Sequence, residues 1–271
     1  MDNLAPQKNG TLLYGDDFTL EQIKRWYEDE SEAYAELGAV DRSNYSYAYH
    51  LLNQRFGFKY LPSKQRFGHA VGLGSAYGDE FEPIADRIER LTILEPSTDL
   101  RREGRLGTAE VSYQTPNPDG KMTFQSSSVD LFTSLGVLHH IPNVSRILSE
   151  IARCLRGGGI LVMKEPVVSM GDWTKPRPGL TRHERGLPRR WLLDRLEDNQ
   201  FDIVSCIDFN SGLCRTFCKK MGLSLYGSST TINIDRHLSR AGLMFQTYRR
   251  STLLSKLAPA SIYIVAKRRQ G

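Results

Sequence analysis

A glycine-rich turn between two apolar runs constrains the fold of this chain more than any other feature. The turn reads Val71-Gly72-Leu73-Gly74-Ser75-Ala76-Tyr77-Gly78. The largely apolar residues 67–71 before it predict a strand. The apolar positions after it recur at helical spacing and are Phe81, Ile84, Ala85 and Ile88. Because Gly72 and Gly74 lack a Cβ, the backbone can turn sharply and approach a ligand, so we predict strand, turn and helix, with the helix N-terminus facing that ligand.

An acidic residue closes the next apolar run, Leu91-Thr92-Ile93-Leu94-Glu95. Glu95 stands where the second strand of a βαβ unit would end, and a carboxylate there can accept hydrogen bonds from both hydroxyls of a ribose. We interpret the turn and Glu95 together as a nucleoside-binding unit. A surface glutamate at a strand end is the alternative. Tyr77 occupies the position where a dinucleotide-binding turn would carry its third small residue.

Two further runs carry a family resemblance. They are Val129-Asp130-Leu131-Phe132-Thr133-Ser134-Leu135-Gly136-Val137-Leu138-His139-His140 and Leu155-Arg156-Gly157-Gly158-Gly159. With the glycine turn and Glu95, they resemble in order and spacing the motifs of the class I S-adenosylmethionine-dependent methyltransferases. The resemblance covers roughly residues 65–166 and says little about the methyl acceptor.

The resemblance implies an α/β fold with a Rossmann-like, seven-stranded, mostly parallel sheet and helices on both faces. It also implies S-adenosyl-L-methionine as the cofactor. Asn117 and Asp119 follow the expected third strand, residues 109–113, where the family contacts adenine. The positions matched to cofactor binding are Gly72, Gly74, Ser75, Gly78, Glu95, Pro96, Asn117, Asp119, Ser134, Leu135 and Gly136.

The flanks of this core predict additional helical parts. We expect an N-terminal helical cap over residues 1–64 and the cofactor-binding domain over residues 65–271, with a basic loop at 169–190 and a helical insertion at 211–259. Thr19 and Gln22 form a capping box that predicts a helix start. Six tyrosines lie from Tyr14 to Tyr49, and Tyr27 and Tyr47 are our candidates for acceptor contacts.

The basic loop carries a local excess of positive charge. Between Lys175 and Arg190 there are six basic residues and one acid, a local charge of +5 that equals the formal net charge of the chain. The planar guanidinium fork pairs well with phosphate and carboxylate. We predict that Arg182 and Arg185 bind an anionic group of the acceptor, with a solvated surface loop as the alternative.

Two adjacent histidines, His139 and His140, follow the expected fourth strand. Transfer of a methyl group to oxygen releases a proton, and histidine suits a base near neutral pH. The resemblance implies that the first position faces the acceptor, so His139 is the base candidate and His140 the second catalytic candidate. The alternative is that both histidines serve only in packing and hydrogen bonding within the motif. No carboxylate-rich cluster with ligand spacing stands beside that strand, so we predict no metal site and disfavour magnesium-dependent chemistry.

Composition sets broader bounds. The 271-residue chain has a pI near 9.0, which permits an anionic partner without requiring one. No apolar run approaches the ~18 residues of a membrane span, and the four cysteines match no metal-finger spacing. We therefore expect a reduced, cytoplasmic protein. No nucleic acid is expected, because the basic residues gather in one loop.

The functional prediction is methyl transfer from S-adenosylmethionine to a small-molecule or sugar acceptor. A loose resemblance around Ser169-Met170-Gly171-Asp172-Trp173 favours O-methylation in bacterial polysaccharide or secondary-metabolite biosynthesis. One alternative is an NAD(P)-type oxidoreductase, which Tyr77 and the Leu-His-His run oppose. The other is a non-catalytic nucleoside- or RNA-binding module. The acceptor atom and the oligomeric state stay open.

Overall fold

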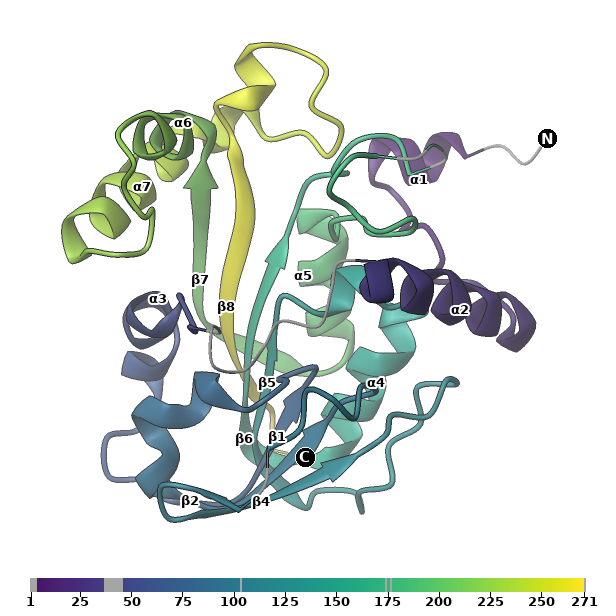
Figure 1. The fold of residues 1–271 in the computed structure, drawn as a ribbon, viewed down its shortest axis with the longest axis vertical. Coiled ribbons are helices and arrows are strands. Elements are labelled where there is room, and N and C mark those ends of the chain that lie inside the picture. The colour runs from purple at the N-terminus through teal and green to yellow at the C-terminus, as the bar shows by residue number, and fades with distance from the viewer. Residues whose placement is uncertain (1–3, 37–45, 103, 174, 176, 271) are drawn as a thin grey trace.

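The computed structural model describes residues 4–36, 46–102, 104–173, 175 and 177–270, with the backbone alone for residues 31–36. An eight-stranded sheet in the order β3-β4-β2-β1-β5-β6-β8-β7 forms its centre (Figure 1). The strands are β1 (Phe67–Leu73), β2 (Ile88–Leu94), β3 (Arg105–Leu106), β4 (Ala109–Gln114), β5 (Val129–Leu135), β6 (Leu155–Pro166), β7 (Phe201–Ser211) and β8 (Pro259–Arg268).

The sheet is mostly parallel, as predicted. The strands β4, β2, β1, β5 and β6 pair in parallel, and β8 lies antiparallel between β6 and β7. The extra strand relative to the predicted seven is β3, which forms a short antiparallel hairpin with β4. Because parallel strands end on the same side, the motifs that follow them meet at one carboxyl edge of the sheet.

Helices cover both faces of the sheet. The α-helices are α1 (Ala5–Asn9), α2 (Leu20–Glu36), α3 (His50–Phe56), α4 (Val144–Cys154), α5 (Arg189–Asp198), α6 (Gly212–Lys220) and α7 (Ser229–Gly242). The 3₁₀ helices are η2 (Phe58–Tyr60), η3 (Asp79–Arg87), η4 (Leu138–His140), η5 (Leu243–Phe245) and η6 (Leu254–Lys256). The helices α4 and α5 share one apolar core with Phe132, whereas α3, η3 and α7 share the other with Leu131. This alternation along β5 is what a strand buried on both faces requires.

The element after the glycine turn differs from the prediction. It is a nine-residue 3₁₀ helix, η3, with Pro83 inside it. Proline lacks an N–H group and disturbs a regular α-helix, which gives a physical reason for the tighter form. Ile88, assigned to this helix from its spacing, is the first residue of β2.

The predicted helical flanks are present. Thr19 N–H donates to Gln22 Oε1 at 2.9 Å and Gln22 N–H to Thr19 Oγ1 at 3.4 Å, which confirms the capping box before α2. The insertion predicted at 211–259 holds α6, α7, η5 and η6 at the carboxyl end of β7 (Figure 1). The domain boundary predicted at residue 64 stays a prediction.

All four cysteines are free thiols, without disulfide bonds. Among the described segments no helix combines the length and apolarity needed to cross a bilayer.

Candidate active site

The glycine turn lies between the ends of two neighbouring strands. Leu73 at the end of β1 pairs with Leu94 of β2 and with Ser134 of β5. Glu95 and Leu135 therefore flank Gly74 on its two sides. Gly74 and Gly78 adopt φ angles of 59° and 77°, in the left-handed region that favours glycine. The three predicted parts of the cofactor site thus meet at the carboxyl edge.

The first part, the turn itself, is tightly packed. A Cβ on Gly72 would overlap the Ser75 hydroxyl, and one on Gly74 would lie 2.7 Å from Val137 Cγ1. Ser75 is buried, and its hydroxyl donates to Glu80 Oε1 at 2.9 Å. The protein's own packing therefore favours glycine at both positions.

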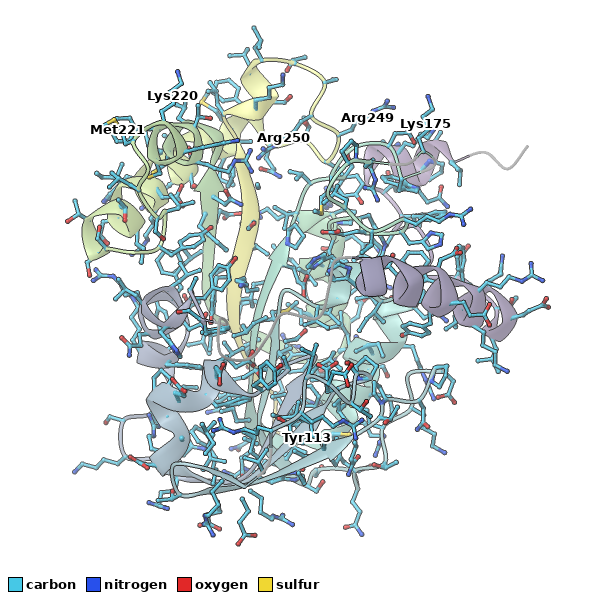
Figure 2. All side chains as sticks on the ribbon, in the orientation of Figure 1. Tyr113, Lys175, Lys220, Met221, Arg249 and Arg250 are labelled. Carbon is cyan, nitrogen blue, oxygen red and sulfur yellow. The ribbon has the colours of Figure 1, made fainter. Side chains whose placement is uncertain are left out.

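The second part is the Glu95 carboxylate, which is 5% exposed. It accepts hydrogen bonds from Ala76 N–H at 3.2 Å and Ser97 N–H at 3.0 Å, and Pro96 lies between Glu95 and Ser97 in this bend. Burial raises the pKa of Glu95. Tyr113 of β4, labelled in Figure 2, donates its hydroxyl to Ala76 O at 3.0 Å. Glu95 thus ties the end of β2 to the glycine turn.

The third part is the end of β5. The Ser134 hydroxyl is buried and has no hydrogen-bond partner among the described residues. Gly136 has a φ of 83°, and its N–H donates to Lys164 O at 2.6 Å. An unpartnered hydroxyl, left-handed glycines and a carboxylate at adjacent strand ends form a donor and acceptor set that fits a nucleoside cofactor.

Asn117 and Asp119 lie on an exposed turn after β4. Asn117 Nδ2 donates to Lys121 O at 2.8 Å, and Asp119 Oδ1 accepts from Lys121 N–H at 3.0 Å. Their side chains therefore close their own turn. The preceding strand β4 ends beside Glu95, whose N–H donates to Gln114 O at 3.0 Å. An adenine contact at Asn117 or Asp119 stays a prediction.

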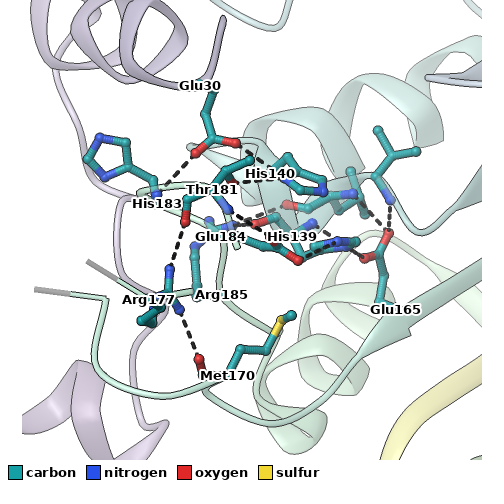
Figure 3. A network of polar contacts seen from close by, with 12 residues as sticks. Glu30, His139, His140, Glu165, Met170, Arg177, Thr181, His183, Glu184 and Arg185 are labelled. Carbon is teal, nitrogen blue, oxygen red and sulfur yellow. Dashed lines mark hydrogen bonds and ion pairs between the residues drawn. The ribbon is translucent and has the colours of Figure 1, made fainter. Parts of the chain in front are cut away.

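The histidine turn, residues 138–141, is held from two sides (Figure 3). On one side Glu165 of β6 accepts hydrogen bonds from the N–H groups of Val137 at 3.0 Å, Leu138 at 2.8 Å and His139 at 3.3 Å. On the other side Arg185 donates to the carbonyl oxygens of Leu138 at 3.2 Å, His139 at 2.9 Å and Ile141 at 2.9 Å. One carboxylate and one guanidinium thus fix the backbone of this turn.

Glu165 also orients the imidazole of His139. Its Oε2 lies 2.7 Å from His139 Nδ1, and because this carboxylate already accepts backbone N–H groups, Nδ1 is the donor. Burial lowers the pKa of His139, although Glu165 opposes the shift. The neutral ring then carries its lone pair on Nε2, which lies 3.6 Å from Glu184 Oε1. This arrangement leaves Nε2 as the acceptor atom of the ring, and the assignment of His139 as the base stays a prediction.

His140 connects the turn to the N-terminal helix α2. Its Nδ1 lies 3.2 Å from Glu30 Oε2, and its carbonyl oxygen accepts from Trp26 Nε1–H at 2.7 Å. Although burial opposes it, hydrogen bonds from His140, Thr181 and His183 lower the pKa of Glu30. These contacts give His140 a positioning role, and its assignment as catalytic stays a prediction.

The histidines also meet a carboxylate that the sequence did not place there. His139, His140 and Glu184 offer ligand atoms that all lie within 4.8 Å of one another. Glu184 comes from the loop after β6, far along the chain, so no local spacing could reveal the group. The predicted lack of a metal site stays a prediction, which chelation can test.

The position of Arg185 argues against acceptor binding, and that assignment stays a prediction. Its side chain is 0% exposed, donates to Tyr14 O at 2.9 Å as well as to the histidine turn, and lies 4.9 Å from the Trp26 ring. Burial lowers its pKa to about 10. A guanidinium committed to backbone carbonyls has too few free donors to bind an acceptor anion. Arg182 is exposed and lies 3.0 Å from Asp29, so its acceptor role stays a prediction.

Aromatic residues of the N-terminal segment lie close to the site. The Tyr47 hydroxyl accepts from Asn53 Nδ2 at 2.8 Å, and burial raises the pKa of Tyr27 to about 12. Acceptor contacts by Tyr27 and Tyr47 stay predictions. Lys164, which no sequence pattern singled out, lies near the end of β6 with Nζ 3.6 Å from the centroid of the Tyr49 ring. Burial lowers the pKa of Lys164 to about 8.

Comparisons with known proteins agree with this geometry. Residues 71–163 match the family model described as a methyltransferase domain. No curated protein matches the sequence. An S-adenosylmethionine-dependent methyltransferase from Mesorhizobium loti has a TM-score of 0.52 at 16% identity, over 82% of this chain and 99% of that one.

A second solved structure is similar to the same extent. It is phosphoethanolamine N-methyltransferase 2 from Haemonchus contortus, in complex with phosphomonomethylethanolamine and S-adenosylhomocysteine. The TM-score is 0.51 at 14% identity, over 81% of this chain and 52% of that one. At these identities the likeness establishes the fold.

Proposed function

We propose that the chain is a class I S-adenosylmethionine-dependent methyltransferase that methylates an oxygen atom of a small-molecule or sugar acceptor. The family match spans the glycine turn, Glu95, β5 and the histidine turn. The observation that carries the choice of oxygen is the His139 imidazole, held by Glu165 with Nε2 available as a base. An alcohol loses a proton on methylation, so it gains most from such a base.

The residues at the carboxyl edge fit the cofactor. When bound, S-adenosylmethionine supplies a methyl group activated by a sulfonium. We assign Glu95 to its ribose hydroxyls and the segments 72–78 and 134–136 to its remaining polar groups. Positioning of this kind can contribute ~7–11 kcal/mol toward the barrier of a two-substrate reaction.

His139 then acts on the acceptor. Its Nε2 takes the hydroxyl proton, and Glu165 stabilises the resulting imidazolium through Nδ1 at 2.7 Å. Glu184 Oε1, 3.6 Å from Nε2, provides a second carboxylate that favours the charged ring. Base catalysis of this kind is worth ~10²–10⁴-fold in rate.

The acceptor class is tested with labelled methyl donor. A panel of sugars, nucleotide sugars and phenols would be incubated with enzyme and the products analysed by mass spectrometry and NMR. We expect a labelled O-methyl group, in keeping with a cytoplasmic role in polysaccharide or secondary-metabolite biosynthesis. Methylation of nitrogen or carbon alone would refute the oxygen assignment, and turnover of NAD(P)H would favour the oxidoreductase alternative.

Glu95→Ala is expected to weaken S-adenosylmethionine binding by ~1.5–3 kcal/mol, the usual loss for hydrogen bonds to a charged group. Calorimetric titration measures the change. Glu110→Ala, on the exposed face of the neighbouring strand β4, is the matched control and should bind the cofactor as wild type does. Equal affinities of the two variants would remove Glu95 from the cofactor site.

The pH dependence of kcat separates two candidate bases. Because burial lowers the pKa of His139, the ring stays neutral and active as pH falls, and it is protonated only below the ordinary value of ~6.5. We therefore expect kcat to be flat near pH 7 and to fall at lower pH. Lys164, with a pKa of about 8, would instead lose activity as the pH drops through 8. A fall near pH 8 would transfer the base role to Lys164.

A further inference from the structure

The C-terminal part of the chain has an unusual charge distribution. Residues 212–257 contain eight cations and one acid, Asp235. Asp235 is 1% exposed and accepts hydrogen bonds from Asn210 N–H at 2.7 Å and Ser211 N–H at 2.8 Å, so it contributes no exposed negative charge. The surface of this segment is therefore cationic and lacks compensating acids of its own.

The same segment exposes large apolar side chains. Seven of the twelve exposed large hydrophobic residues of the described chain form what we call the α6–η6 patch. They are Leu213, Phe217, Met221, Leu223, Met244, Leu253 and Leu254. Met244 and Leu253 are each 80% exposed. Scattered apolar residues are normal on a surface, but a concentration of this kind marks an interaction site.

The members of the α6–η6 patch lie at one end of the molecule. Leu213, Phe217 and Met221 recur every fourth residue and so form one stripe along α6. A Cβ on Gly212 would overlap the carbonyl oxygen of Lys256, so α6 begins against η6. Figure 2 shows Lys220, Met221, Arg249 and Arg250 at this end. The patch therefore combines an apolar stripe with a cationic rim.

A cavity adjoins the rim of the α6–η6 patch. It has a volume of about 370 Å³ and lies between residues 168–172 and residues 249–251. Arg249 and Arg250 both line it, and Arg250 Nε is buried without a hydrogen-bond partner in the described part of the chain. Guanidinium groups at the rim of an apolar surface suit the phosphate of a lipid headgroup.

We propose that the α6–η6 patch docks the protein onto the surface of an anionic lipid bilayer. Aliphatic side chains enter the boundary between headgroups and acyl chains, while the surrounding Lys and Arg residues approach the anionic headgroups. Since α6 follows directly on β7, docking turns the carboxyl edge of the sheet, and with it the active site, toward the bilayer. The inference does not rest on the proposed acceptor.

A second copy of the chain and single-stranded RNA fit the α6–η6 patch less well than a bilayer does. A symmetric pair of copies would bring two cationic surfaces together, and like charges across an interface are unfavourable. Single-stranded RNA is bound by stacking on exposed aromatic rings, whereas Phe217 is the one aromatic member of this otherwise aliphatic patch among the described residues. The charge and the apolar composition together favour an anionic bilayer.

Vesicle sedimentation tests the proposal with the full chain. Vesicles of equal parts phosphatidylglycerol and phosphatidylcholine should pellet the wild-type protein, vesicles of phosphatidylcholine alone should not, and added salt should weaken binding. Lys219→Glu with Lys220→Glu should weaken binding roughly tenfold or more. The matched control, Lys59→Glu with Lys121→Glu, reverses two exposed lysines elsewhere and should retain most of the binding.

The apolar contribution is tested separately. Phe217→Ser with Leu253→Ser should also weaken vesicle binding roughly tenfold or more, whereas Val204→Ser, which changes an exposed apolar residue of β7, should not. Thermal melting checks that every variant is folded. The proposal is overturned if wild type stays in the supernatant with both vesicle types, or if the patch variants bind as the controls do. It is equally overturned if vesicle binding is absent while the patch variants abolish a dimer in ultracentrifugation or the binding of an RNA oligonucleotide.

Discussion

Replacing His139 with alanine is expected to lower kcat by ~10²–10⁴-fold and to leave the affinity for S-adenosylmethionine nearly unchanged. The imidazole is buried at the carboxyl edge with Nδ1 fixed by Glu165, so its removal deletes the base without touching the glycine turn. Single-turnover rates with labelled cofactor measure the chemical step, and calorimetry measures cofactor affinity.

Two controls make this result specific to His139. His237→Ala removes an exposed histidine of α7 and should leave kcat unchanged. Dialysis of the wild-type enzyme against a chelator should also leave the rate unchanged. A rate lost on chelation and restored by added zinc would make His139, His140 and Glu184 a metal site instead. A lower melting temperature that accounts for the whole loss of activity would return His139 to a packing role.

Arg185→Met is expected to lower the free energy of unfolding by ~3–5 kcal/mol, the largest stability effect we expect for a side chain of the basic loop. The guanidinium is fully buried and donates to the carbonyl oxygens of Tyr14, Leu138, His139 and Ile141. Methionine fills similar space but leaves these buried acceptors without partners. Urea denaturation measures the change.

Arg182→Met is the matched control within the same loop. Its side chain is 69% exposed and pairs with a single carboxylate, Asp29. Exposed ion pairs contribute only ~0–1 kcal/mol, so this variant should unfold close to wild type. Similar losses in the two variants would contradict the anchoring role of Arg185 and would revive its assignment to the acceptor.

The parts of the fold that could be predicted are those whose sequence pattern has a local cause. Strand β5 carries apolar residues toward both faces, among them Leu131 and Phe132, because a central parallel strand is buried on both sides. Gly74 and Gly78 stand where the backbone needs positive φ angles, and this requirement is visible in the sequence. The ends of η3 and β2 could not be placed from spacing alone, because Pro83 changes the helix type within an otherwise helical apolar pattern.

The residues around the histidines could not be predicted, because their roles depend on a loop that folds back over the sheet edge. A count of charges does not distinguish Arg182, which faces solvent, from Arg185, which is buried against carbonyl groups. In the same way Glu165 reads as an ordinary polar residue at the end of a strand. Only the tertiary structure shows that it holds three backbone N–H groups and an imidazole.

The way the histidine turn is held has a consequence for how the site opens. Three of its N–H bonds share the Glu165 carboxylate, and three of its carbonyl groups share the Arg185 guanidinium, so these six bonds cannot be lost one residue at a time. Displacement of either side chain releases several backbone groups at once. The turn should therefore behave as a small cooperative unit that unfolds locally in a single step, apart from the sheet beneath it. In such a unit the His139 imidazole is fully aligned when the turn is folded and displaced from the site when the turn is unfolded. Partly misaligned states are sparsely populated.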